Sequence, residues 1–201
     1  MIEPSRSLTL ITKAVVQHLL LVLVCAGFLE SCTFMRENHI VSRPTIRENA
    51  DWQMMENCGY EGCYPMVDFL TGKHLSIRIQ SENDEKSNIF LILTNFTVKG
   101  NGYFKLDPSR FVLHLANGKI LIPKVIPCSG TLYDLSYLRS VPGLEGPIVI
   151  EDKRGACVRL FFDEPPPSVE ETFILRIAGV TMRGEPVDIP EVIFRKGISR
   201  Y

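Results

Sequence analysis

The feature of the sequence that most restricts the fold is a two-residue alternation of apolar and polar side chains. Leu75, Ile77 and Ile79 alternate with polar residues, which is the pattern of a strand with one buried face. Residues 89–98 begin with five consecutive apolar side chains, which is typical of a central strand covered on both faces. No segment shows convincing helical periodicity, so we expect an all-β protein.

The dipeptide Asn117-Gly118 predicts a β-hairpin, because both central residues of a type I′ turn need positive φ. Its strands are expected at 111–116 and 119–122. Further strands are expected at four apolar runs separated by turn residues: 147–151, 157–163, 173–180 and 187–194, the last at an edge or with a bulge because of Pro190. About eight strands of this spacing favour an antiparallel β-sandwich, immunoglobulin-like or transthyretin-like in layout; the alternative is a small β-barrel.

Length and charge restrict the function. The 201 residues suit one domain with a short extra segment. The 22 Lys and Arg residues are balanced by 23 Asp and Glu residues. Binding to nucleic-acid phosphates needs a basic surface, so we expect no nucleic-acid partner.

The first thirty-one residues have the organisation of an export signal. Arg6 and Lys13 provide positive charge ahead of an apolar run that ends at Leu29. The run is shorter than the roughly 20 apolar residues that a membrane-spanning helix needs. A cleaved signal peptide is therefore favoured over a permanent anchor.

The end of this segment, Leu29-Glu30-Ser31-Cys32, resembles the lipobox of bacterial lipoproteins, with an aliphatic residue, a small residue and then a cysteine. It departs from the family at Glu30, where a small or aliphatic residue is usual. The resemblance implies that Cys32 receives a diacylglycerol thioether and becomes the first residue of the mature chain. Because Thr33 follows instead of aspartate, it also implies the outer membrane, facing the periplasm. Without lipidation, Cys32 would be an ordinary thiol, with cleavage after Ala26 or retention of the apolar segment.

The cysteine count agrees with lipidation. Five cysteines follow the apolar run, and an odd thiol in an oxidising compartment needs a separate role. Lipidation of Cys32 leaves four, and we predict disulfides between Cys58 and Cys63 and between Cys128 and Cys157. Two other connectivities and buried free thiols remain as alternatives. A four-thiolate zinc site is less favoured, because such sites bring cysteines in two close pairs.

A polar tether is expected between the signal and the fold. Residues 33–51 are polar and charged and show no sustained apolar period. Deletion of 33–50 is therefore expected to leave stability nearly unchanged. The chain is predicted to comprise a signal peptide (1–31), a tether (32–51) and a single β-sandwich domain (52–201).

The common catalytic motifs are missing from the sequence. It contains no G-x-S-x-G, H-E-x-x-H, G-x-x-x-x-G-K-[ST] or C-x-x-C. His114 alternates with expected core positions, and His74 opens a strand without an acidic neighbour at metal-ligand spacing. We therefore predict no catalytic residue, no metal ion and no cofactor.

The segment 163–171 is the most distinctive loop. It holds four carboxylates and three consecutive prolines, which favour a stiff, extended chain. We interpret it as a solvated acidic loop. The alternative is a partner-docking edge, because a rigid segment loses little conformational entropy on binding.

Two classes of function remain. The first is a non-catalytic lipoprotein of the cell envelope, anchored to the membrane by its lipid, that binds an envelope protein through loops or an open sheet edge. This comparison rests on the signal and the fold class. The second is a small periplasmic enzyme or ligand-binding protein with a site built from residues distant in sequence. A stoichiometric envelope partner would favour the first class, and a deep polar pocket the second.

Overall fold

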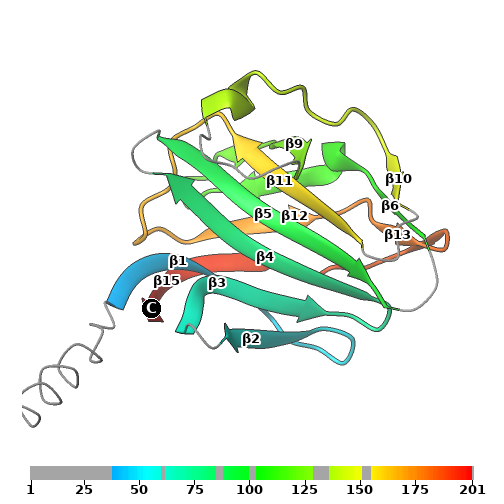
Figure 1. The fold of residues 1–201 in the computed structure, drawn as a ribbon, viewed down its shortest axis with the longest axis horizontal. Coiled ribbons are helices and arrows are strands. Elements are labelled where there is room, and N and C mark those ends of the chain that lie inside the picture. The colour runs from blue at the N-terminus through cyan, green and yellow to red at the C-terminus, as the bar shows by residue number, and fades with distance from the viewer. Residues whose placement is uncertain are drawn as a thin grey trace, which may run out of the picture. The chain divides into compact units, whose positions relative to one another are not determined.

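The computed structural model of the chain describes residues 38–59, 62–84, 88–99, 103–128, 136–150 and 155–200. Within these ranges the regular structure consists of fifteen strands and two short 3₁₀ turns, without an α-helix. The prediction of an all-β fold is therefore confirmed (Figure 1).

The strands form two antiparallel sheets. The larger sheet contains β1 (Asn38–Ile46), β2 (Gln53–Gly59), β3 (Gly62–Thr71), β4 (Leu75–Asp84), β5 (Ile89–Val98), β7 (Phe111–His114), β8 (Ile120–Leu121), β9 (Lys124–Pro127), β11 (Ala156–Phe162), β12 (Phe173–Ile177) and β15 (Val192–Arg200). The smaller sheet contains β6 (Phe104–Leu106), β10 (Ile148–Ile150), β13 (Thr181–Met182) and β14 (Glu185–Pro186). The 3₁₀ turns are η1 (Pro108–Arg110) and η2 (Ser136–Arg139).

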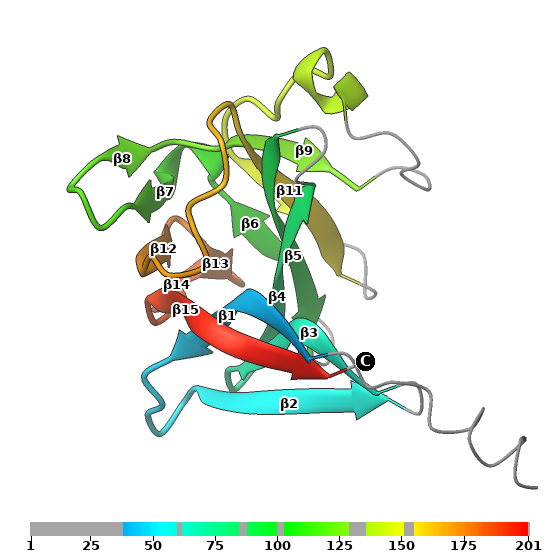
Figure 2. The same ribbon diagram turned by 90° about the vertical axis from the view of Figure 1, so that its left-hand side faces the viewer.

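The larger sheet folds over itself into two layers. Its strand order is β8-β7-β12-β15-β3-β4-β5-β11-β9, with β1 beside β15 and β2 beside β3. The link between β15 and β3 is a single residue pair, Arg200 opposite Cys63. The sheet can therefore bend sharply there, and the layer containing β4, β5 and β11 faces the layer containing β7, β12 and β15 (Figure 2).

Aromatic side chains from both layers meet in the core. The ring of Phe90 on β5 lies 4.7 Å from that of Phe162 and 5.6 Å from that of Phe173 on β12. Phe173 in turn stacks on Phe194 of β15 at 4.6 Å. Contacts at these centroid distances are typical of packed aromatic pairs. The predicted sandwich arrangement is thus confirmed by packing between the layers.

Strand β5 is covered on both faces, as the apolar run at its start predicted. Its core-facing side chains belong to the main cluster, whereas Ile89 and Leu91 point to the other side. There they form a second buried cluster with Phe161, Ile126 and Leu138, the last from η2. The η2 turn therefore covers the outer face of this layer.

The β7–β8 hairpin is confirmed, but its turn type differs from the prediction. Only Gly118 has positive φ, at 83°, so the turn is not type I′. The Gly118 N–H donates to the carbonyl oxygen of Leu115 at 3.0 Å, which closes a β-turn one residue earlier. A turn of this kind followed by a glycine of positive φ is the usual three-residue hairpin.

Strand β1 lies within the segment that was expected to be a tether. Residues 38–46 pair with β15 along all nine positions, from Asn38 opposite Arg200 to Ile46 opposite Val192. Thr45 adds a side-chain hydrogen bond, in which its Oγ1 donates to the carbonyl oxygen of Ile193 at 2.9 Å. The tether prediction is wrong for these residues, and the folded domain includes β1 and does not begin at residue 52.

The amino-acid composition of β1 explains why its sequence resembles that of a linker. Its buried positions are Ser42, Pro44 and Ile46, so only one of the three is aliphatic. Pro44 is tolerated because, among the described strands, β1 pairs only with β15 and so lies at an edge. The strand is held mainly by backbone pairing, which leaves no apolar alternation to detect.

The remaining strands agree in part with expectation. The predicted runs near 147–151, 157–163 and 173–180 correspond to β10, β11 and β12. The last predicted strand begins later, at Val192, because Pro190 lies before the ladder and not within it. The β2–β3 hairpin and the strands β6, β9, β13 and β14 were not predicted.

Candidate functional site

A cleft of about 560 Å³ opens at one end of the sandwich. Three segments line it: 51–52 after β1, 72–75 between β3 and β4, and 182–188 around the β13–β14 hairpin. We call it the loop cleft. The third segment is more than 100 residues from the other two in sequence, so only the folded chain assembles the cleft.

Trp52 forms the floor of the loop cleft. Its side chain is only 3% exposed, and its Nε1 donates a hydrogen bond to the carbonyl oxygen of Asp188 at 2.8 Å. Gly72 packs against the indole so closely that a Cβ there would lie 2.8 Å from the ring. Asn49 fixes the loop that presents the tryptophan, because its Oδ1 accepts from the backbone N–H of Trp52 at 2.7 Å and of Asp51 at 2.9 Å. The floor is therefore rigid.

Charges of both signs surround this floor. The exposed charged and titratable lining residues are Asp51, Glu185 and Asp188, together with Lys73, His74 and Arg183. The positive φ of Arg183 and of Gly184, 53° and 90°, closes the hairpin tip that carries part of this rim. The mixed rim has no strong single sign, so it suits a ligand or peptide of mixed charge better than a polyanion.

His74 lies in the loop cleft but lacks the contacts of a catalytic base. Its carbonyl oxygen accepts from the N–H of Lys99 at 2.8 Å, which fixes the backbone. Among the hydrogen bonds and ion pairs of the described residues, none involves its imidazole. A general base normally needs a partner that orients it.

His114 lies elsewhere, on β7 between Ile174 of β12 and Ile120 of β8. Its Nε2 is buried and has no hydrogen-bond partner. It does not line the loop cleft, so the structure does not bring the two histidines together.

The disulfide between Cys128 and Cys157 is confirmed. The Cα atoms are 5.3 Å apart, and the bond joins residues separated by 29 positions. It connects the end of β9 to the start of β11, where the Cys128 N–H also donates to the carbonyl oxygen of Cys157 at 3.0 Å. Because these sulfurs are bonded to each other, they cannot join Cys58 and Cys63 in a four-thiolate zinc site.

The second predicted disulfide stays a prediction. Cys58 and Cys63 are direct Cα partners in the ladder between β2 and β3. Their side chains lie outside the described part of the structure. Direct cross-strand partners are close enough for a disulfide in principle.

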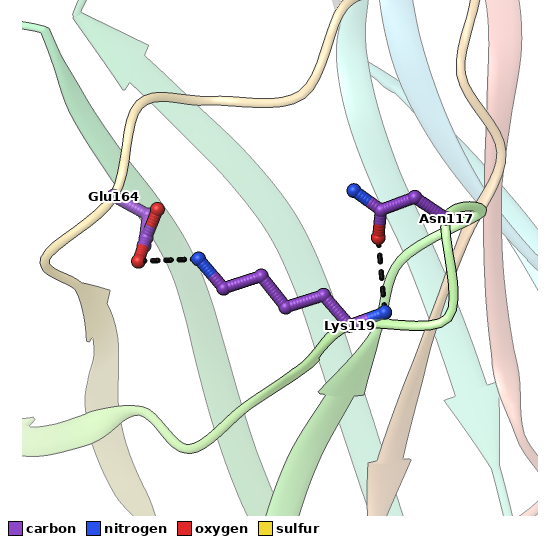
Figure 3. A network of polar contacts seen from close by, with 3 residues as sticks. All are labelled: Asn117, Lys119 and Glu164. Carbon is purple, nitrogen blue, oxygen red and sulfur yellow. Dashed lines mark hydrogen bonds and ion pairs between the residues drawn. The ribbon is translucent and has the colours of Figure 1, made fainter.

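The acidic loop 163–171 is fastened near both ends by the protein's own cations. Glu164 accepts from the Nζ of Lys119 at 2.7 Å, beside the Asn117 turn (Figure 3). Glu170 accepts from the Nζ of Lys196 on β15 at 2.6 Å. Asp163 is in turn paired with the Nε of Arg139 at 3.9 Å. These exposed pairs contribute little to stability, but they engage three of the four carboxylates of the loop.

The predicted lipidation site, Cys32, and the whole signal segment lie outside the described residues. Within the described ranges, no helix is long and apolar enough to cross a membrane. In the same ranges, no three His, Cys, Asp or Glu side chains gather so that they could hold a metal ion.

Comparisons of the chain with known proteins identify no related protein. No protein-family model matches the chain, and no curated protein or solved structure matches it significantly. The fold and the site therefore define only a class: a disulfide-bonded β-sandwich with a loop-built cleft of mixed charge at one end.

Proposed function

We propose that this chain is a lipid-anchored protein of the bacterial envelope that binds an envelope protein through the loop cleft. The observation that carries the proposal is the path of β1. The strand begins six residues after Cys32 and ends at Ile46, five residues before the cleft begins at Asp51. Nine strand residues span about 26 Å. The proposed lipid site thus precedes the start of this strand, and the cleft follows its end.

The start of β1 and the end of β15 lie together at the end of the sandwich that is opposite the loop cleft. Asn38 is opposite Arg200, and Arg200 is opposite Cys63 of the β2–β3 hairpin. The five residues from 33 to 37 can span at most about 18 Å. A lipid on Cys32 would hold this end close to the bilayer, and the loop cleft would face away from the membrane.

The proposed location is the outer membrane, facing the periplasm. The lipobox-like sequence and Thr33 support it through resemblance to lipoproteins. The Cys128–Cys157 disulfide supports it weakly, since such bonds persist in oxidising compartments. A single acyl chain binds only marginally, but the three chains typical of lipoproteins would make attachment lasting.

A non-catalytic role is supported by the chemistry of the loop cleft. Its rim mixes carboxylates and cations, and its only histidine has no orienting partner among the described side chains. The volume also favours a second candidate, a small-molecule binding protein, because ligand sites commonly measure about 300 to 1,000 Å³. The two candidates differ in what occupies the cleft.

Site-specific photo-crosslinking in cells tests the proposal. Benzoylphenylalanine replaces Lys73 or Glu185, which are exposed on the cleft rim, and Ala116, exposed in the β7–β8 turn, serves as the control. We expect one discrete adduct with an envelope protein from the two rim positions and none from the control. The adduct should disappear when Cys32 is replaced by alanine.

Equal labelling from all three positions, or none from the rim, would contradict the proposal. A small molecule that co-purifies with the protein and is lost from the Trp52→Ala variant would support the second candidate instead.

A further inference from the structure

Arg159 is a charged side chain in an unusual position. On β11, Val158, Leu160 and Phe162 face the core, so Cys157, Arg159 and Phe161 face the outer side of the layer. Arg159 is nevertheless only 8% exposed. Its register partners are Leu93 on β5 and Ile126 on β9, both aliphatic.

The guanidinium of Arg159 is not satisfied by the protein. Its Nε and Nη1 are buried and have no hydrogen-bond partner. A guanidinium keeps its charge in proteins, so the energetic cost of burying it is not relieved by deprotonation. A buried charge without a counter-charge is strongly unfavourable, and each buried unsatisfied group calls for an explanation.

The described side chains nearby do not supply that counter-charge. Along β11, Arg159 is flanked by Phe161 and by Cys157, which is bonded to Cys128. The partner of Phe161 on β9 is Lys124, whose Nζ donates to the carbonyl oxygens of Leu138 and Arg139. This part of the outer face therefore combines apolar walls with the cations Lys124 and Arg139. The carboxylate described beside them, Asp163, is paired with the Nε of Arg139 at 3.9 Å.

We propose that Arg159 is the anchor of a site for a small oxyanion, bound through a carboxylate or phosphate group on the outer face of β5, β11 and β9. The anion would accept charge-assisted hydrogen bonds from the free N–H groups, and the apolar surroundings would strengthen them. Lys124 would add attraction without direct contact. The site is separate from the loop cleft and does not depend on the function proposed for it.

The test uses the full chain, purified in detergent, and two probes: inorganic phosphate and acetate. Each is titrated at constant ionic strength against chloride, with calorimetry for binding and thermal unfolding for stability. We expect one probe or both to bind, and comparison of the two identifies a phosphate or carboxylate preference. At ten times its Kd, a bound probe should raise the ratio of folded to unfolded protein about 11-fold.

Three variants make the test specific. Arg159→Met should abolish binding while the unfolding midpoint stays equal or rises, because an uncompensated buried charge has been removed. Arg139→Met is the matched control: it removes an exposed cation from the same region and should still bind. If Arg159→Met does not fold, Arg159→Lys keeps the charge but lacks the Nε donor, and should bind at least tenfold more weakly.

Failure of wild-type protein to bind either probe would overturn the proposal, as would binding that persists in Arg159→Met. A third outcome would also overturn it: if Arg159→Met lowers the unfolding midpoint and the probes have no effect on the wild-type protein, the arginine has a partner within the chain.

Discussion

Replacing Gly72 by alanine tests whether the floor of the loop cleft is as tightly packed as its geometry indicates. A Cβ at this position would lie 2.8 Å from Cζ2 of Trp52 and 3.0 Å from two further indole carbons. Favourable carbon contacts lie at about 3.5 to 4.0 Å. The indole would have to move, although it is 3% exposed and bonded to the carbonyl oxygen of Asp188.

The expected cost follows from these two contacts. Overpacking in a core typically costs about 1 to 3 kcal/mol. Loss of the hydrogen bond from Trp52 adds about 1 kcal/mol. Gly72→Ala should therefore lower the free energy of unfolding by about 2 to 4 kcal/mol.

Urea unfolding measures this change directly. Trp52 is the only tryptophan of the chain, so its fluorescence reports on the site, and far-UV circular dichroism reports on the sheets. A double-mutant cycle with Trp52→Phe separates the clash from a general effect of alanine. The smaller ring leaves room for the Cβ, so Gly72→Ala should cost at least about 1 kcal/mol less in that background. Equal costs in both backgrounds would refute the reasoning.

Three further predictions concern the whole chain. Deletion of 33–37 should change stability by less than about 0.5 kcal/mol, whereas deletion of 33–46 removes β1 and should cost at least about 3 kcal/mol; thermal unfolding compares the two. Cys157→Ser opens a 29-residue loop and should cost about 3 to 4 kcal/mol by calorimetry. Its effect should exceed that of Cys63→Ser, and the reverse order would contradict the loop-length argument. Cys32→Ala should move the protein to the soluble fraction or block its processing, and normal cleavage with unchanged membrane retention would rule out the lipid.

The sequence predicts strands well where burial imposes a period. The start of β5 is apolar at every position because both of its faces are covered, and the alternation in β4 reflects a single buried face. Strand β1 escapes detection because Ser42 and Pro44 occupy two of its buried positions. A strand that is held by backbone hydrogen bonds does not need an alternation of apolar side chains, so its sequence does not reveal it.

The sites are harder to predict than the strands. The number and spacing of the cysteines predict the disulfide between Cys128 and Cys157, although two other connectivities fit the same count. The loop cleft does not, because the hydrogen bond from Trp52 to Asp188 joins residues 136 positions apart. Arg159 sits on the outward side of its strand, where the alternation predicts exposure, and only the folded structure shows that it is covered.

The pairing of β1 with β15 determines when, during synthesis and folding, the sandwich can be completed. Thr45 and Ile193, which meet in this ladder, are 148 residues apart, so the ladder closes late and slowly. During synthesis, β1 is the first of the described strands to be made and must wait for β15, the last of them. The loop cleft takes Trp52 from just after β1 and residues 182–188 from just before β15, so it would be completed only when nearly all of the described chain is available.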